Sequence, residues 1–240
     1  MIKKERQDQI LEIIKERKYC TVAFLSKHLF VAPITIRRDL TEMEDAGLVT
    51  RCFGGATVPE YENREIPFEV RERQNAAIKD RLAQKAAKLI RPGDVVMMDA
   101  STTVSHIADY LSEEQDLTVI TSSMLVARKL QEKHILCYLT GGRPVETSYA
   151  LVGSIAEKTV ESLYANIFFF SAQGVDENGI ISDQSEGEGN LRRVMMKNSK
   201  KQYFLFDGSK YGKRFAFKIC DVDEIDGFIT DREEVAFRNT

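Results

Sequence analysis

The chain has 240 residues, 43% of them hydrophobic and 30% charged, which fits a globular protein of one large domain or two smaller ones. It contains no run of about 20 apolar residues and no N-terminal signal pattern, so we expect a cytoplasmic protein without a membrane partner. Its four cysteines and three histidines are scattered without metal-ligand spacing, which argues against a zinc site and fits thiols in a reducing compartment.

The net charge of −3 is distributed unevenly along the chain. Residues 1–57 contain 10 Lys and Arg against 8 Asp and Glu, whereas the remaining residues contain 24 against 29. A mildly basic head followed by an acidic body is a weak indication of two parts with different functions.

Three helical patterns follow one another in the basic head. Apolar residues at helical spacing predict a helix over residues 4–18. Thr21 is placed to cap a second, short helix with an apolar inner face over residues 22–29. Pro33 suits the first turn of a third helix, and Gly47 suits its end.

The third helix has an apolar inner side and a polar outer side. Ile36, Leu40 and Met43 recur at spacings of four and three, which predicts that they are buried. Because a helix turns about 100° per residue, the outer side carries five other residues. These are Ile34, Thr35, Arg37, Arg38 and Thr41.

Arginines on such an outer side can fork onto guanine or phosphate, and a β-branched apolar tip can meet a thymine methyl. Asp39 lies toward the flank, where it could orient a neighbouring arginine. For the arginine pair alone, a solvated helix face is the simpler explanation. The flanking elements decide between the two interpretations.

After this helix, the stretch "LVTRCFGGATV" contains an apolar strand start, Arg51 and the pair Gly54–Gly55. Such a pattern predicts a tight β-hairpin, or wing. Two helices, a recognition helix and a wing make a winged helix-turn-helix domain, which binds double-stranded DNA.

The motifs "ERQDQILEII", "TIRRDL" and "RCFGGA" resemble the N-terminal signature of the DeoR family of bacterial sugar-metabolism repressors. One departure is Ala32, where the family usually carries serine. The resemblance implies binding to operator DNA through the recognition helix, the preceding cap and the wing. The predicted DNA-binding residues are Thr21, Ile34, Thr35, Arg37, Arg38, Thr41, Arg51, Gly54 and Gly55.

The sequence predicts three segments with different roles. Residues 1–57 form the DNA-binding domain. Residues 58–74 are polar, contain two prolines and lack periodicity, which predicts a linker. Residues 75–240 form a larger domain for effector binding and oligomerisation.

Helical and strand patterns alternate in the larger domain, which predicts an α/β fold with a mostly parallel sheet covered by helices. Helices are predicted near 78–89, 104–111, 124–132, 153–163 and 190–197, and strands at 95–98, 117–121, 135–140, 166–172, 202–207 and 225–231.

Ligands of such sheets bind at the carboxyl ends of the strands, and polar clusters follow several of the predicted strands. Residues 99–103, "DASTT", open a helix and could cradle a phosphate, although plain helix capping explains their hydroxyls equally well. Further clusters lie at 121–123, 140–144, 171–179 and 207–210. No glycine-rich nucleotide motif is present, so no cofactor is expected.

These clusters are similar to those of the DeoR family's effector domain, whose fold is similar to that of ribose-5-phosphate isomerase and the CoA transferases. Ser101 and Ser122 depart from the family's usual glycine and asparagine. The resemblance implies a phosphorylated sugar as the effector. The predicted effector-binding residues are Asp99, Ser101, Thr102, Thr103, Ser122, Ser123, Gly141, Gly142, Arg143, Gly174, Asp176 and Lys210.

An isomerase-like enzyme is the alternative, since isomerisation of a sugar phosphate needs a carboxylate base and a cation. Asp176, Glu186 and Glu188 could supply the carboxylate. The loop 180–190 contains no lysine or arginine, and Lys210 needs no chemistry to contact a phosphate. We therefore predict a homodimeric or homotetrameric repressor that its effector releases from DNA, and no catalysis.

Overall fold

The computed structural model describes residues 2–46, 48–52, 54–57 and 66–237. The chain separates into two compact units, Met1–Gln74 and Asn75–Thr240, which are treated separately below. They are called the head and the sensor unit.

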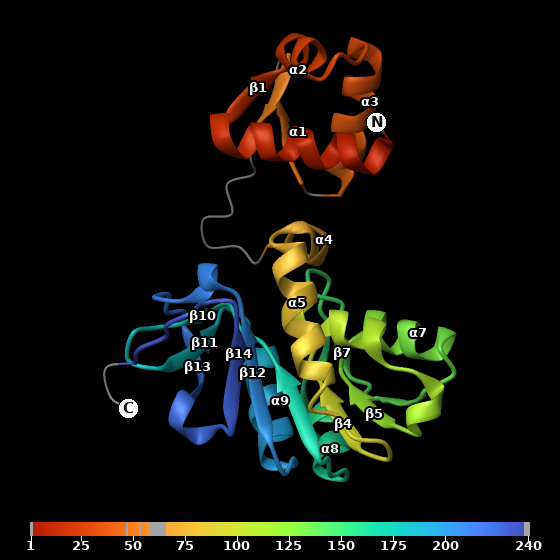
Figure 1. Cartoon of the computed structure of the whole chain (residues 1–240), viewed down its shortest axis with the longest axis vertical. Coiled ribbons are helices and arrows are strands. Elements are labelled where there is room, and N and C mark those ends of the chain that lie inside the picture. The colour runs from red at the N-terminus through yellow and green to blue at the C-terminus, as the bar shows by residue number, and fades with distance from the viewer. Residues whose placement is uncertain (1, 47, 53, 58–65, 238–240) are drawn as a thin grey trace. The chain divides into compact units, whose positions relative to one another are not determined.

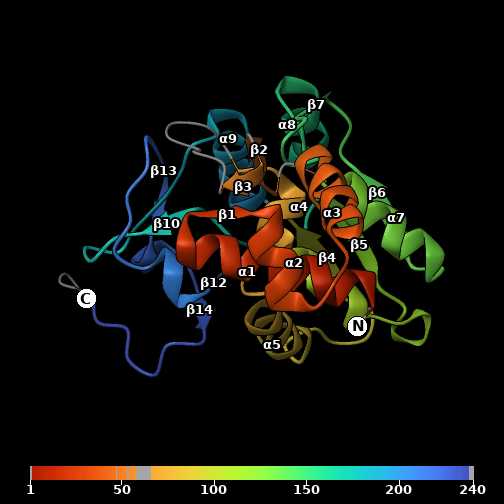
Figure 2. The same ribbon diagram turned by 90° about the horizontal axis from the view of Figure 1, so that it is seen from above.

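The head contains the three predicted helices: α1 (Lys3–Arg17), α2 (Val22–Leu29) and α3 (Pro33–Asp45). The Thr21 hydroxyl accepts a hydrogen bond from the Phe24 N–H (3.1 Å) and caps α2 as predicted. Ala32 gives α3 no side-chain cap. The predicted stop at Gly47 lies outside the described residues. Figure 1 and, from above, Figure 2 show α2 and α3 side by side.

The predicted wing consists of β2 (Thr50–Cys52) and β3 (Gly55–Thr57), which pair antiparallel. An unpredicted strand, β1 (Tyr19–Thr21), pairs with the other side of β3. A Cβ atom at position 55 would lie 2.2 Å from the Cys20 carbonyl oxygen. Glycine at this position therefore lets β3 approach β1 closely.

The apolar stripe predicted for α3 is confirmed, since Ile36, Leu40 and Met43 are all buried in the core of the head. Residues 58–65 of the predicted linker lie outside the described residues. Its second half forms the helix α4 (Phe68–Arg73), whose Val70 is buried in the same core.

The sensor unit is built around a six-stranded parallel sheet in the order β14-β12-β9-β4-β5-β6. The strands, at the predicted places, are β4 (Val95–Met98), β5 (Thr118–Thr121), β6 (Leu136–Leu139), β9 (Ile167–Phe170), β12 (Gln202–Phe206) and β14 (Gly227–Thr230).

Helices cover both faces of this sheet (Figure 1). On one face lie α5 (Ala76–Ala87), α6 (Thr102–Ser105) and α7 (Met124–Glu132), with their apolar side chains in one core cluster. On the other lie α8 (Ser154–Glu161) and α9 (Glu186–Lys197), which pack on Phe168, Phe170 and Phe204. The four inner strands, β4, β5, β9 and β12, are mostly buried because both faces of the sheet are covered there.

The helix predicted at 104–111 begins earlier, at Thr102, and continues as a 3-10 helix over His106–Tyr110. The first predicted helix of this unit ends at Ala87, so Leu89 is 40% exposed and Ile90 is buried in its place.

Short antiparallel strands complete the unit, and none of them was predicted. β10 (Gly174–Val175), β11 (Ile180–Asp183) and β13 (Phe217–Asp221) form a three-stranded sheet. β7 (Arg143–Pro144) pairs with β8 (Leu151–Val152). Among the described residues, no helix has the length and apolar character required to cross a bilayer.

Candidate functional sites

The outer side of α3 is open to solvent, as its periodicity predicts. The Arg38 side chain is 78% exposed and Ile34 is 70% exposed. Five of the predicted DNA-binding residues share one groove of about 460 Å³ with residues of α1. The groove is lined by Lys3, Arg6, Ile34, Thr35, Arg37, Arg38, Asp39 and Thr41.

Asp39 does not orient Arg37 or Arg38, contrary to the sequence prediction. It is 1% exposed and accepts hydrogen bonds from Arg6 of α1, from Nε (2.5 Å) and from the terminal nitrogen (3.1 Å). The hydrogen bond and charge of Asp39 raise the pKa of Arg6 despite partial burial. The ion pair joins α1 to α3, and Arg37 and Arg38 point outward.

The wing and the recognition helix are joined through Arg51. Its guanidinium donates to the Thr41 hydroxyl (2.9 Å), and its backbone N–H donates to the Glu44 carboxylate (2.8 Å). Two predicted DNA-binding residues, Thr41 and Arg51, are therefore held side by side.

The other three predicted DNA-binding residues have structural contacts. Thr21 caps α2, the Gly54 carbonyl accepts from the Val22 N–H (2.9 Å), and Gly55 packs on β1. Sequence reasoning did not name Lys3, which lines the groove and pairs with Glu42 (2.6 Å). Its spacing of three from Arg6 on an N-terminal helix was the available signal.

In the sensor unit, the predicted clusters after β4, β5, β9 and β12 meet at the carboxyl edge of the sheet. The Asp99 carboxylate accepts from the N–H groups of Ser101 (3.0 Å) and Ser171 (3.1 Å). Lys210 Nζ donates to the Ser171 hydroxyl (2.8 Å). Thr121 Oγ1 donates to the Met98 carbonyl (2.8 Å).

Two of the predicted hydroxyls cap helices. Ser101 Oγ accepts from the Val104 N–H and Ser123 Oγ from the Val126 N–H, each at 3.2 Å. Thr103 differs, because its hydroxyl is fully buried and has no hydrogen-bond partner among the described residues. A buried polar atom without a protein partner requires an explanation, and a ligand site is one.

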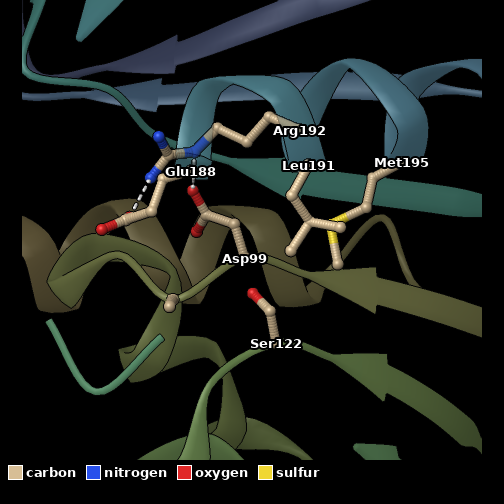
Figure 3. A pocket seen from close by; sticks show the side chains of 7 residues that line it. Asp99, Ser122, Glu188, Leu191, Arg192 and Met195 are labelled. Atoms are coloured by element: carbon tan, nitrogen blue, oxygen red, sulfur yellow. Dashed lines mark hydrogen bonds and ion pairs between the residues drawn. The ribbon is translucent and has the colours of Figure 1, made fainter. Parts of the chain in front are cut away.

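An arginine that sequence reasoning missed lies at the centre of this edge (Figure 3). Arg192 of α9 contacts three carboxylates: Asp99 (2.8 Å), Asp183 (2.9 Å) and Glu188 (3.0 Å). All four side chains are at most 6% exposed. We call these four residues the Arg192 cluster.

Burial disfavours the charged guanidinium, but the three carboxylates outweigh this and raise the pKa of Arg192. With all groups ionised, three negative charges face one positive charge, a net of −2. The i,i+4 spacing of Glu188 and Arg192 was visible in the sequence. The contacts to Asp99 and Asp183 were not, because they depend on tertiary packing.

The cavity beside the Arg192 cluster is small, about 10 Å³, which is space for roughly one water molecule. It is lined by Asp99, Ser122, Leu191 and Met195, and in Figure 3 the Asp99 carboxylate points toward Arg192. Two predicted effector-binding residues, Asp99 and Ser122, therefore line one cavity, which has no room for a sugar phosphate.

Residues 145–152, called here the covering segment, lie over this edge. Val145, Ala150 and Val152 pack on Ala100. The Leu151 N–H donates to the Ser122 carbonyl (2.8 Å). Ser148 Oγ donates to Glu188 (2.7 Å), which connects the segment to the Arg192 cluster.

The cluster predicted at 141–143 supports the covering segment. Gly142 has a φ of +109°, and a Cβ atom there would lie 2.6 Å from the Val152 carbonyl oxygen. Gly141 also has a positive φ, of +70°. Arg143 is exposed in β7, where it pairs with Val152.

Gly174 and Asp176 belong instead to the small antiparallel sheet and its turn. The Asp176 carboxylate accepts from the N–H groups of Asn178 (3.0 Å) and Ile180 (2.9 Å) and from Arg214 (2.7 Å). Burial raises the pKa of Asp176, but these donors outweigh it and lower the pKa overall. In the described contacts, neither residue touches the loops after β4 and β5.

Lys79 was also missed by sequence reasoning. It is 3% exposed on α5. Burial raises the pKa of Asp207, but hydrogen bonds from Ser209 and the charges of Lys210 and Lys79 outweigh this effect and lower the pKa. A lysine on the same helix face as Leu82 and Ala86 was the signal. Among the described residues, no group of His, Cys, Asp and Glu has the arrangement of a metal site.

A winged helix-turn-helix head followed by a parallel α/β unit with a polar carboxyl edge defines a DNA-binding transcriptional regulator with a sensor domain. Residues 6–62 match the DeoR-like helix-turn-helix domain, and residues 74–232 match the DeoR C terminal sensor domain. The chain belongs to the DeoR family.

Curated relatives match along nearly the whole chain. The uncharacterized HTH-type transcriptional regulator YulB of Bacillus subtilis is 35% identical over 96% of this chain and 90% of its own length. The L-fucose operon activator of Haemophilus influenzae is 32% identical, covering 95% and 91%. The lactose phosphotransferase system repressor of Staphylococcus aureus is 30% identical, covering 98% and 94%.

Solved structures match part of this chain at low identity. A tetrameric eIF2B-beta2-delta2 complex from C. thermophilum matches 65% of this chain and 56% of its own, with a TM-score of 0.51 and 15% identity. A ribose 5-phosphate isomerase from Methanocaldococcus jannaschii matches 57% and 55%, with a TM-score of 0.44 and 18% identity. Because the long matches are to named regulators with a DNA-binding head, the chain is a regulator and not an isomerase.

Proposed function

We propose that this regulator binds paired half-sites of operator DNA as a homo-oligomer and represses a carbohydrate operon until a phosphorylated sugar binds its sensor unit. The names of relatives that regulate lactose and L-fucose genes support the carbohydrate assignment. The proposal places the protein in the cytoplasm, where operator DNA and sugar phosphates are both found.

The buried hydroxyl of Thr103 is the observation that carries the effector assignment. It lies in the first turn of α6, at the carboxyl end of β4, and has no partner among the described residues. Parallel sheets bind ligands at this edge, and the first N–H groups of a helix favour anions. We therefore place the phosphate at residues 101–103.

Electrostatics support the same position of the phosphate. A phosphate beside the Arg192 cluster would meet a net charge of −2, which repels it. Lys210, which contacts Ser171, provides positive charge near Asp99. The phosphate accordingly points toward Thr103 and Lys210, and the sugar hydroxyls donate to the carboxylates of Asp99 and Glu188.

Binding requires the covering segment to move, because the present cavity holds roughly one water molecule. The hydrogen bonds from Ser148 to Glu188 and from Leu151 to Ser122 are the ones that must open. A ligand that binds only the open arrangement shifts the protein toward it and can thereby change the spacing of the two heads.

The test compares Thr103→Val with wild type in thermal unfolding, with phosphorylated and unphosphorylated forms of the same sugars. A bound effector at a hundredfold excess over Kd should stabilise wild type by about 2.7 kcal/mol. In Thr103→Val, this gain should disappear. The ligand-free variant should be more stable by about 1–3 kcal/mol, because valine removes a buried unsatisfied hydroxyl without changing the side-chain shape.

Thr159→Val is the matched control, because Thr159 donates to the Ile155 carbonyl on the exposed side of α8. It should keep the full ligand response. If Thr103→Val also keeps it, the phosphate does not bind at this turn. An operator gel shift with the same sugars distinguishes a repressor that is released from an activator that is retained.

A further inference from the structure

The strand β6 lies at an edge of the sheet but has the sequence of an interior strand. Among the described residues it pairs only with β5. Its exposed apolar side chains are Leu136 (57%), Tyr138 (49%) and Leu139 (41%). Apolar side chains on both faces are typical of strands whose two faces are both covered, whereas these three side chains are exposed.

The backbone of β6 is also available for pairing. The Thr140 N–H donates to the Thr121 carbonyl of β5 (3.1 Å). Because peptide groups along a strand point alternately to its two sides, those of Tyr138 also face β5, and those of Cys137 and Leu139 face the open edge. The edge thus presents a row of donors and acceptors beside apolar side chains.

The opposite edge, β14, is protected in the ways that edge strands normally are. Asp226 and Asp231 flank the strand and accept hydrogen bonds from Gln202 and Gly208. Phe237 packs against Phe228 at 5.7 Å between ring centroids. No comparable protection exists at β6, since residues 135–142 contain no charged side chain and no proline.

We infer that the open edge of β6 is the interface between two copies of this chain, paired antiparallel across a two-fold axis. A two-fold contact brings the same strand of both copies together, so a strand with charges of one sign would repel its copy, whereas this neutral apolar strand does not. The two six-stranded sheets then become one sheet of twelve strands. The inference rests on the proposed function only in that paired half-sites require two heads.

A four-residue strand alone is too small for a stable dimer, which buries about 800 Å² on each partner. The exposed side of α7 supplies additional surface. A groove of about 700 Å³ runs between β6 and the α7 residues Met124, Ala127 and Gln131. Arg128 lines the groove, and its charge is balanced by Glu132, 3.1 Å away, which lets two copies meet without repulsion.

The test measures the mass of the full chain in solution by light scattering. One chain has a mass of 27.3 kDa, so wild type should have at least twice this mass. The double variant Leu136→Lys/Tyr138→Lys should have half the wild-type mass, because it places two copies of each lysine at the interface. Tyr164→Lys is the control, since Tyr164 is 63% exposed and lies outside this edge; it should keep the wild-type mass.

A second pair of variants tests the main-chain contact. Leu139→Pro removes an N–H that faces away from β5, which edge strands tolerate, so the sensor unit should fold and the dimer should be lost. Leu139→Ala keeps this N–H and should retain more of the dimer. Thermal unfolding of each variant verifies folding.

A wild-type mass of one chain, or an unchanged mass in both the lysine and proline variants, would overturn the inference. In the second case the proposed function stands and the interface lies elsewhere. An operator gel shift separates the two proposals further. Monomeric variants that bind the operator as tightly as wild type would support the β6 interface and contradict the requirement for paired heads.

Discussion

The head and the sensor unit present their candidate binding residues in opposite ways. In the head, Arg38 and Ile34 point into solvent from a helix whose other side forms the core. In the sensor unit, Asp99, Ser122 and Thr103 are at most 3% exposed. A DNA duplex can bind to side chains that are already exposed on the surface, whereas a small molecule has to be enclosed by the protein.

This difference shows where each unit can tolerate change. Outer residues of α3 can vary without disturbing the core, because Asp39 and Leu40 hold the helix from its inner side. The sensor residues each have two roles, since Asp99 both holds Arg192 and faces the cavity. Variants that separate binding from folding should therefore be common in the head and rare in the sensor unit.

Leu40→Asp should have the largest effect, confined to the head. Leu40 is 1% exposed, and a buried unpaired carboxylate together with the lost packing should cost about 4 kcal/mol or more. Calorimetry should show loss of the head transition with the sensor transition unchanged. Thr41→Asp, on the outer side of α3, should weaken DNA binding with the head still folded. Full operator binding by Leu40→Asp would mean that the faces of α3 are reversed.

Arg192→Met should destabilise the sensor unit by about 3–5 kcal/mol, because three buried carboxylates lose their cation. In this variant the buried carboxylates repel one another without a cation, and protonation removes this repulsion. Stability should therefore be highest at low pH and fall as the pH rises. Thermal unfolding between pH 5 and pH 8 measures this dependence.

Arg91→Met is the control for the arginine variant, since Arg91 is exposed on the same unit. Its stability should follow the wild-type dependence on pH. A pH-independent loss in Arg192→Met would show that packing, and not charge, accounts for its cost.

Arg38→Ala should leave folding unchanged and weaken operator binding. Loss of a base contact should cost about 1–3 kcal/mol and relax specificity at one position. Loss of a phosphate contact should instead weaken binding to all sequences and lower the salt slope by about 0.9. Gel shifts at two salt concentrations distinguish these outcomes. Wild-type affinity in the variant would remove α3 from DNA recognition.

Phe30→Gly should have the smallest effect, a gain in head stability of up to about 1 kcal/mol. Phe30 has a φ of +55° at the end of α2, a conformation that glycine adopts without strain. Its side chain is 95% exposed, so little packing is lost. Denaturant unfolding of the head measures the change, and a lower midpoint would indicate that the ring has a packing role.

Most of the head could be predicted from the sequence because its determinants are local. The stripe Ile36, Leu40 and Met43 and the cap at Thr21 each depend on neighbours in one helix. β1 was missed because a three-residue strand exists only through its pairing with β3. The partner predicted for Asp39 was wrong, because Asp39 contacts Arg6, which lies 33 residues earlier in the chain.

In the sensor unit, the parallel strands were predicted because they contain short apolar runs, such as Val95–Met98 and Ile167–Phe170. The positions of 99–103 and 121–123 followed from the rule that ligands bind at strand ends. The Arg192 cluster could not be found in this way, because Asp99 and Arg192 are 93 residues apart. The covering segment was missed because β7, which precedes it, and β8, which ends it, are each two residues long.

The helix α4 determines how regulators of this kind can be recombined. Val70 is 4% exposed within the core of the head, although it follows the recognition helix by 25 residues and lies beyond the wing. A chimaera joined after residue 57 would combine this head with a foreign α4 and leave part of its core unfilled. Joining the two parts between Gln74 and Asn75 keeps α4 with its own head, so that a new sensor can be attached without changing operator choice.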